Sequence, residues 1–174
     1  MENTFMRLAV YDNTEKDREL TVSYISAYFE RTDIPVKIHR FYDTNGLIDA
    51  FRHDQFTAVF IGMDSMNEVD AAWIIRKFAP GCSLVIMSNS GDYSLEGYRL
   101  EAFNYWLKPV GSEKAGETLE RLMAHHTVPH TKDFKRNITH LSEHDLEGIA
   151  AAGLPPDEQR KKQKELHVNG KLII

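Results

Sequence analysis

The stretch FTAVFIGMD, residues 56–64, decides the fold, because an apolar run passes there directly into a loop. Val59, Phe60 and Ile61 are consecutive apolar residues, which is typical of a strand covered on both faces of a sheet. Gly62 stands at the end of the run, and Asp64 follows it. The stretch therefore predicts a central strand over 57–61 that ends at a polar edge of the sheet.

Four further short apolar runs have the same character and alternate with stretches of helical spacing. The predicted strands are 5–11, 35–41, 57–61, 83–87 and 104–107, and the predicted helices are 15–31, 45–53, 68–79, 92–101 and 112–125. Strict alternation of this kind predicts an α/β fold with a parallel sheet covered by helices on both faces. Asn13 or Thr14 is the expected cap of the first helix, with Asp17 in the capping-box position.

Composition limits the architecture and the class of partner. The chain has 174 residues, of which 42% are hydrophobic, and this is enough for one domain with an appendage. We expect a domain over 1–124 and a C-terminal extension over 125–174, mostly helical with a terminal hairpin. The net charge of −5 gives little general attraction to nucleic acid or to an anionic membrane.

The cellular compartment follows from what the sequence lacks. Cys82 is the single cysteine, so no intramolecular disulfide and no thiolate metal cage can form. The first residues do not have the pattern of a secretory signal, and no apolar stretch is long enough to span a membrane. We expect a cytoplasmic protein that does not enter a membrane.

Polar residues follow the predicted strands at the edge where a parallel sheet binds its ligands. They are Asp12, Asn13, Asp64, Ser88, Asn89 and Lys108, and Gly62 stands at the end of the third strand among them. Carboxylates suit Mg²⁺, a hydroxyl can bond a phosphoryl oxygen, and an ammonium can neutralise its charge. The combination predicts a crevice related to phosphoryl chemistry.

These segments resemble a known family, the receiver domains of bacterial two-component response regulators. The resemblance covers about residues 5–124 and rests on LAVYDN (8–13), on FTAVFIGMD (56–64) and on VIMSNSGDYSLEGYRLEAFNYWLKPV (85–110). The last segment is similar to receivers that precede a LytTR-type DNA-binding domain. The resemblance implies a flavodoxin-like sheet with strand order 2-1-3-4-5 and a role in phosphorelay signalling.

The resemblance also implies roles for single residues. Asp12 matches one of the two acids that hold Mg²⁺, and Asn13 stands where the second acid is common. Ser88 matches the switch hydroxyl, and Tyr105 matches the switch aromatic residue. Lys108 matches the lysine of the phosphorylation pocket, followed by a proline whose peptide bond is commonly cis.

Gly62 falls on the phosphoacceptor aspartate of the family, and glycine has no nucleophile. The pocket would then be vestigial, Lys108 would pair with Asp12, and the protein would not be an enzyme. The Mg²⁺ site would use Asp12 and the backbone carbonyl of Asp64, so we expect no cofactor or at most weak Mg²⁺ binding. An alternative makes Asp64 the acceptor, although we expect its side chain to face solvent.

Each of these residues also has a purely structural interpretation. Asp12 and Lys108 would form a residual ion pair, Ser88 would satisfy backbone groups in a turn, and Tyr105 would be half-buried packing. Gly62 would accommodate an unusual backbone angle or a close approach.

The partner surface implied by the resemblance is the face over 92–125, which would bind another protein or a second copy of this chain. Its apolar members are Tyr93, Leu95, Tyr98, Leu100, Trp106, Leu119, Leu122 and Met123. Mixed aromatic and charged residues suit an interface. The alternative for most of these residues is packing between helix and sheet.

The extension offers a second hypothesis, a DNA-binding transcription regulator in which the receiver serves as the dimerisation module. Its features are a short basic run at 160–164, His140 and His144 as weak candidates for Zn²⁺, and a hairpin-like ending over 165–174. The first hypothesis remains a receiver that works through protein contacts without aspartyl phosphorylation.

Overall fold

A computed structural model describes residues 6–127, which form a parallel five-stranded sheet in the order β2-β1-β3-β4-β5. The strands are β1 (Met6–Tyr11), β2 (Val36–Phe41), β3 (Ala58–Gly62), β4 (Ser83–Ser88) and β5 (Asn104–Leu107). The helices are α1 (Glu15–Phe29), α2 (Thr44–His53), α3 (Met66–Phe78), α4 (Ser94–Arg99) and α5 (Ser112–Thr127). The predicted fold class, strand order and alternation of elements are confirmed.

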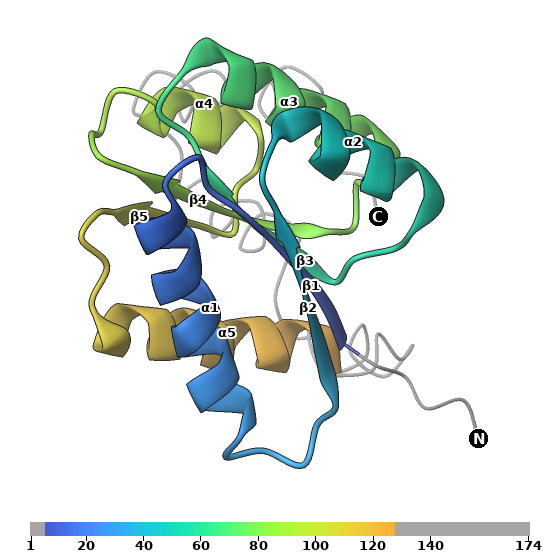
Figure 1. The fold of residues 1–174 in the computed structure, drawn as a ribbon, viewed down its shortest axis with the longest axis vertical. Coiled ribbons are helices and arrows are strands. Elements are labelled where there is room, and N and C mark those ends of the chain that lie inside the picture. The colour runs from blue at the N-terminus through green and yellow to red at the C-terminus, as the bar shows by residue number, and fades with distance from the viewer. Residues whose placement is uncertain (1–5, 128–174) are drawn as a thin grey trace, which may run out of the picture. The chain divides into compact units, whose positions relative to one another are not determined.

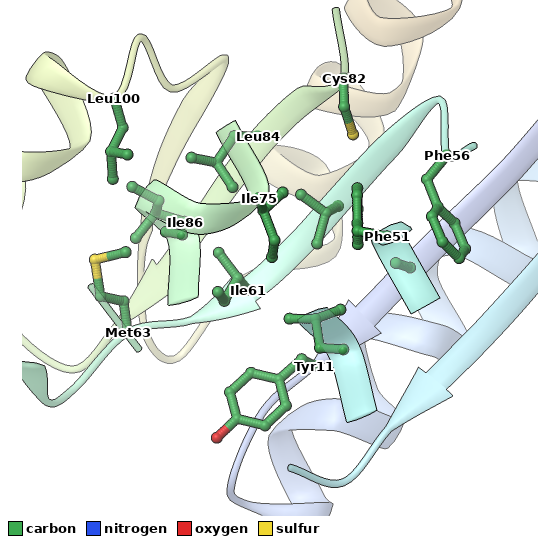
Figure 2. Close-up of a cluster of buried hydrophobic side chains, with 14 of the residues drawn as sticks. Tyr11, Phe51, Phe56, Ile61, Met63, Ile75, Cys82, Leu84, Ile86 and Leu100 are labelled. Atoms are coloured by element: carbon green, nitrogen blue, oxygen red, sulfur yellow. The ribbon is translucent and has the colours of Figure 1, made fainter. Parts of the chain in front are cut away.

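The helices cover both faces of the sheet, with α1 and α5 on one face and α2, α3 and α4 on the other (Figure 1). Every residue of β3 and β4 is buried, as the near-continuous apolar runs at 58–61 and 84–87 predict for central strands. Alternate side chains of β3 enter two separate cores, so Ile61 packs under α2 and α3 while Phe60 packs under α1 and α5. Figure 2 shows the first of these clusters.

Strand β5 is fixed to α5 by polar contacts as well as by packing. The hydroxyl of Thr118 accepts hydrogen bonds from Trp106 Nε1 at 3.0 Å and from Asn104 Nδ2 at 2.8 Å. Trp106 is 1% exposed and packs on Phe60, with ring centroids 5.5 Å apart. These contacts set the position of Lys108, which follows the strand.

The first helix begins differently from the prediction. Thr14 is the N-cap of α1, but its side chain makes no capping hydrogen bond. Asp12 orders the turn before the helix instead, because its Oδ1 accepts the backbone N–H of Thr14 at 2.9 Å. Asp17 pairs with Lys108 and does not complete a capping box. Thr14 is therefore the N-cap, as one of the two predicted residues, but the side-chain hydrogen bond that a cap should make is absent from α1.

The C-terminal boundary of the domain lies slightly beyond the expected one. Helix α5 continues to Thr127, and the compact unit ends at the same residue, so His125 and His126 belong to this domain. The second unit, 128–174, lies outside the described residues. The predicted helical extension, its terminal hairpin, the basic run at 160–164 and the candidate zinc ligands His140 and His144 therefore stay predictions. Within residues 6–127, no helix is long and apolar enough to cross a membrane.

Candidate functional site: the crevice at the carboxyl edge of the sheet

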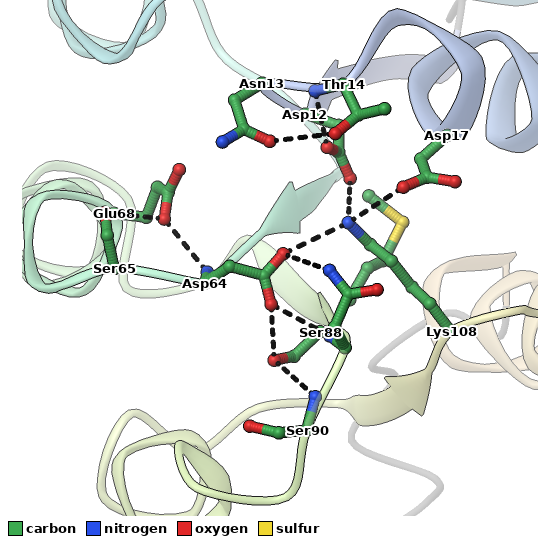
Figure 3. A network of polar contacts seen from close by, with 12 residues as sticks. Asp12, Asn13, Thr14, Asp17, Asp64, Ser65, Glu68, Ser88, Ser90 and Lys108 are labelled. Atoms are coloured by element: carbon green, nitrogen blue, oxygen red, sulfur yellow. Dashed lines mark hydrogen bonds and ion pairs between the residues drawn. The ribbon is translucent and has the colours of Figure 1, made fainter.

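The carboxyl ends of β1, β3, β4 and β5 bring Asp12, Asp64, Ser88 and Lys108 into one polar cluster (Figure 3). Asp12 and Ser88 are completely buried. This is the edge at which the sequence places a crevice, and the predicted residues meet there.

Three carboxylates surround the ammonium group of Lys108. Its Nζ lies 2.7 Å from Asp12 Oδ2, 3.3 Å from Asp17 Oδ2 and 3.3 Å from Asp64 Oδ2. Burial opposes the charged form of the ammonium, but the hydrogen bond and charge of Asp12, together with Asp64 and Asp17, raise the pKa of Lys108 above its usual value. The predicted pair between Lys108 and Asp12 is confirmed, within a larger group of three carboxylates around one cation.

Asp64 points into the crevice, so the prediction that its side chain faces solvent was wrong. Its Oδ1 accepts hydrogen bonds from Ser88 Oγ at 2.9 Å and from the Asn89 backbone N–H at 2.8 Å. Its Oδ2 accepts from Asn89 Nδ2 at 3.0 Å and from Lys108 Nζ at 3.3 Å. The physical reason is that a partly buried carboxylate is stabilised more by four hydrogen-bond donors, one of them charged, than by its remaining contact with solvent.

Burial raises the pKa of Asp64, but the hydrogen bonds from Asn89 and Ser88 and the charge of Lys108 outweigh it, so the net shift is downward. The carboxylate is therefore ionised at neutral pH. Ser88 also accepts the backbone N–H of Ser90 at 3.3 Å, so it orders the following turn and binds Asp64 at the same time.

Glu68 holds the loop that carries Asp64, and sequence reasoning missed it. Its Oε2 accepts the backbone N–H of Asp64 at 2.9 Å and the hydroxyl of Ser65 at 2.8 Å, although the residue is only 4% exposed. The signal was available, because Ser65 and Glu68 have the spacing of a capping box at the start of α3.

Tyr11 completes the surroundings of Glu68. Its hydroxyl donates a hydrogen bond to Glu68 Oε1 at 3.3 Å. Burial, with the neighbouring charge of Glu68, raises the pKa of Tyr11 to about 12. Glu68 thus connects the end of β1 to the loop after β3.

Arg18 is a second cation at this edge that sequence reasoning missed. It is 6% exposed, and its Nη1 donates to the backbone carbonyl of Asp12 at 2.9 Å. Its guanidinium lies 4.4 Å from the ring centroid of Tyr42. Arg18 lies on the predicted helix 15–31, but no motif distinguishes it from the exposed basic residues nearby.

Gly62 leaves a space that Asp12 occupies. A Cβ placed on Gly62 would lie 2.6 Å from Asp12 Oδ2 and 3.2 Å from Asp12 Cα. The first of these distances is shorter than real Cβ atoms show. A glycine is needed here because Asp12 approaches the backbone of Gly62 closely. This is one of the two structural interpretations that the sequence left open.

A chain of hydrogen bonds leads from the crevice to β5 and α4. Asp64 binds Ser88, Ser88 binds the N–H of Ser90, and the Ser90 carbonyl accepts the Tyr105 hydroxyl at 2.7 Å. A Cβ on Gly97 of α4 would lie 3.1 Å from the Tyr105 ring, so the helix is in close contact with that ring. The ring of Tyr105 is half-buried against the first core, as its structural interpretation predicts. Its hydroxyl donates a hydrogen bond to Ser90 in the loop between β4 and α4.

A divalent cation does not fit the donors as they are arranged. Within residues 6–127, no group of three or more acidic, histidine or cysteine side chains could hold a metal ion. The Lys108 ammonium already lies between the oxygens of Asp12 and Asp64. Asn13 is exposed, and its Oδ1 accepts the hydroxyl of Thr14.

The candidate partner face divides into two groups. Leu100, Trp106, Leu119, Leu122 and Met123 are buried in the cores, so for them the packing interpretation is correct. Leu95 is 50% exposed, and Leu107, which was not among the predicted interface residues, is 57% exposed. The apolar part of this face is therefore smaller than the sequence suggests.

No protein-family model and no curated protein matches the chain. Solved structures do match it. The receiver domain of the protein mrkE from Klebsiella pneumoniae is 21% identical with a TM-score of 0.62, and the match covers 69% of this chain and 97% of that one. A CheY-like receiver domain from Methanospirillum hungatei is 17% identical with a TM-score of 0.57, covering 70% and 96%.

A third similar structure is a DNA-binding response regulator of the LuxR family from Staphylococcus aureus. It is 15% identical with a TM-score of 0.56, and the match covers 67% of this chain and 98% of that one. The fold of residues 6–127 is thus the fold of CheY-like receiver domains.

Proposed function

We propose that the chain is an atypical receiver of a two-component signalling system, a pseudo-receiver that acts through protein contacts without aspartyl phosphorylation. The receiver fold and the placement of Asp12, Ser88 and Lys108 at one edge of the sheet support this role. We place the role in the cytoplasm, in line with the single cysteine.

The observation that carries the proposal is that the Asp12 carboxylate lies against Gly62. Gly62 supplies no nucleophile at the end of β3, and the carboxylate of Asp12 fills the space in which a side chain there would lie. The Lys108 ammonium neutralises this carboxylate at 2.7 Å. The crevice is therefore closed by its own charges, and we infer no enzymatic activity and at most weak Mg²⁺ binding.

The competing receiver chemistry makes Asp64 the phosphoacceptor. Both of its oxygens already accept two hydrogen bonds each, and a carboxylate so engaged is a poor nucleophile. The test is incubation of the full chain with acetyl phosphate and Mg²⁺, followed by intact-mass measurement.

We expect no gain of a phosphoryl group in that test. A gain that Asp64→Asn abolishes and Asp70→Asn retains would overturn the proposal, because Asp70 is an exposed carboxylate of the neighbouring helix. A receiver known to accept phosphate from acetyl phosphate serves as the positive control.

DNA binding is the second candidate function, supported by the basic run at 160–164 and by the similar structure described as a DNA-binding response regulator. A mobility-shift assay with a salt titration tests it, because phosphate contacts weaken steeply as salt rises. Binding at low salt that disappears at high salt would favour this candidate. No binding at low salt would exclude it.

A further inference from the structure

Four hydrogen-bond donors converge on the carboxylate of Asp64 from separate parts of the chain. They are the Ser88 hydroxyl, the backbone and side-chain amides of Asn89, and the Lys108 ammonium, at 2.8 to 3.3 Å. Ser88 ends β4, Asn89 begins the loop to α4, and Lys108 follows β5. Hydroxyl, amide and ammonium donors arranged in this way form a site for a small anion.

The carboxylate does not belong to the segments that form this site. Asp64 lies in the loop between β3 and α3, and Glu68 fixes that loop by accepting the Asp64 N–H at 2.9 Å. The backbone anchor and the carboxylate therefore have different partners. The side chain of Asp64 is 25% exposed, so solvent and small solutes can reach the site from its open side.

We propose that Asp64 is a built-in anion whose carboxylate permanently occupies the site formed by Ser88, Asn89 and Lys108, and so holds the β4–α4 loop and Tyr105 in one fixed state. The inference rests on the proposed function and deepens it. An unphosphorylated receiver of this kind needs no transferred group to set its partner face, because its own chain supplies the negative charge.

The route from the site to the partner face is short. Ser88 binds Asp64 and the N–H of Ser90, and Ser90 accepts the hydroxyl of Tyr105. The Tyr105 ring lies against Gly97 of α4 and against Ile86 in the first core. Loss of the carboxylate frees Ser88 and the Asn89 amide, so the order of this loop and the position of Tyr105 depend on the anion.

The experiment uses the full chain and compares Asp64→Ala with Asp70→Ala. Amide hydrogen exchange at Asn89 and Ser90 is measured residue by residue by NMR, together with the ring signals of Tyr105. We expect exchange at both amides to become at least about tenfold faster in Asp64→Ala, because their acceptors are lost or released. We expect no change in Asp70→Ala.

Chemical rescue then tests whether a free anion can replace the side chain. Sodium formate carries the carboxylate that Asp64→Ala lacks, and sodium chloride at equal concentration is the control. We expect formate to slow exchange at Asn89 and Ser90 and to restore the Tyr105 signals, with no effect on wild type. Asp64→Asn keeps the size of the side chain and serves as the variant where Asp64→Ala does not fold; in it the amides exchange faster than in wild type.

Unchanged exchange in the Asp64 variants would overturn the inference. Faster exchange over the whole domain would also overturn it, because that result reports general destabilisation. Faster exchange at Asn89 and Ser90 that formate does not reverse would overturn it too, because the side chain would then be a structural link that a free anion cannot replace. Transfer of a phosphoryl group from acetyl phosphate to wild type is a separate result, and it would overturn the proposed function whatever the exchange shows.

Discussion

Gly62 and Asp12 form one unit at the end of the first and third strands. Asp12 is completely buried, accepts the N–H of Thr14 through Oδ1 and pairs with Lys108 through Oδ2. This position requires the space beside Gly62 to be empty of any side chain. The glycine therefore admits the carboxylate that neutralises Lys108.

Gly62→Ala should destabilise the domain by about 1 to 3 kcal/mol, the usual cost of an added methyl group in a packed site. The new Cβ would lie 2.6 Å from Asp12 Oδ2, so Asp12 must move from Lys108 or the strands must shift. Urea denaturation measures the change. Gly116→Ala in α5 is the control, because nothing lies within 4 Å of its Cβ, and it should leave stability equal or up to about 1 kcal/mol higher. Equal stabilities of wild type and Gly62→Ala would contradict the close approach.

Lys108→Met should be costly, because it removes the ammonium that pairs with the carboxylates of Asp12, Asp17 and Asp64. Breaking a buried pair costs about 3 to 5 kcal/mol. The folded pKa of Lys108 is raised, so its stabilisation is complete below the unfolded lysine value near pH 10.4 and is lost as the pH rises through the folded value.

The measurement for Lys108→Met is urea denaturation of variant and wild type from neutral pH upward. The difference should stay constant to about pH 10 and narrow above it. Lys114→Met, at an exposed position of α5, is the control and should change stability by less than about 0.5 kcal/mol. A small difference for Lys108→Met at neutral pH would show that the three carboxylates do not depend on this ammonium.

Asp64→Asn should have the opposite pH dependence. The folded pKa of Asp64 is lowered, so its stabilisation is present above the unfolded value near pH 3.9 and is lost as the pH falls through the folded value. The stability difference between wild type and Asp64→Asn should be constant at neutral pH and shrink below about pH 4. Thermal unfolding over this pH range checks it, and a difference that grows with acidity would refute the assignment.

At the scale of elements, the start of α3 connects the fold to the crevice. Glu68 accepts the Asp64 N–H and the Ser65 hydroxyl, and the Tyr11 hydroxyl binds its other oxygen. Carboxylates are favourable in the first turn of a helix, where N–H groups have no partner within the helix. The same residue therefore places a carboxylate in the first turn of α3 and fixes the loop that presents Asp64.

Glu68→Gln should lower the pKa of Tyr11 from about 12 toward its ordinary value, and burial and the charges of Asp12 and Asp43 should keep it above that value. Burial is the largest cause of the raised value, and the charge and hydrogen bond of Glu68 follow it. NMR titration of the tyrosine ring carbons measures the shift, and Glu120→Gln in α5 is the control. An unchanged Tyr11 titration would mean that the hydrogen bond of 3.3 Å carries little energy.

The elements were predictable from the sequence because each has its own local pattern. Continuous apolar runs marked the strands, and the residues after them marked the crevice, so Asp12, Ser88 and Lys108 were found. The direction of the Asp64 side chain was not predictable, since it depends on Glu68 and on donors from two distant loops. The burial of Trp106, Leu119 and Leu122 likewise depends on how α5 lies on the sheet, which an apolar stripe does not determine.

At the scale of the whole domain, part of the exposed apolar surface lies on two neighbouring elements, α4 and β5. The crevice pairs its charges internally, whereas exposed leucines lie on α4 and on β5, the edge strand of the sheet. Leu95 is 50% and Leu107 57% exposed, and the two elements adjoin where Gly97 meets Tyr105. We expect this pair of elements to form the partner face, with a second copy of the chain as its first candidate occupant.

Leu107→Glu should weaken self-association at least about tenfold, because an interface that buries the leucine would have to bury an unpaired charge. Sedimentation velocity over a range of concentrations measures the dissociation constant for wild type and variant. The fold should persist, since the side chain is exposed and outside both cores. Met66→Glu is the matched control, because Met66 is 62% exposed at the start of α3. Helix α3 follows β3, and β4 separates β3 from β5 in the sheet. Equal weakening by both variants would point to an effect of charge alone, and a wild type that stays monomeric at every concentration would leave this face to a different protein.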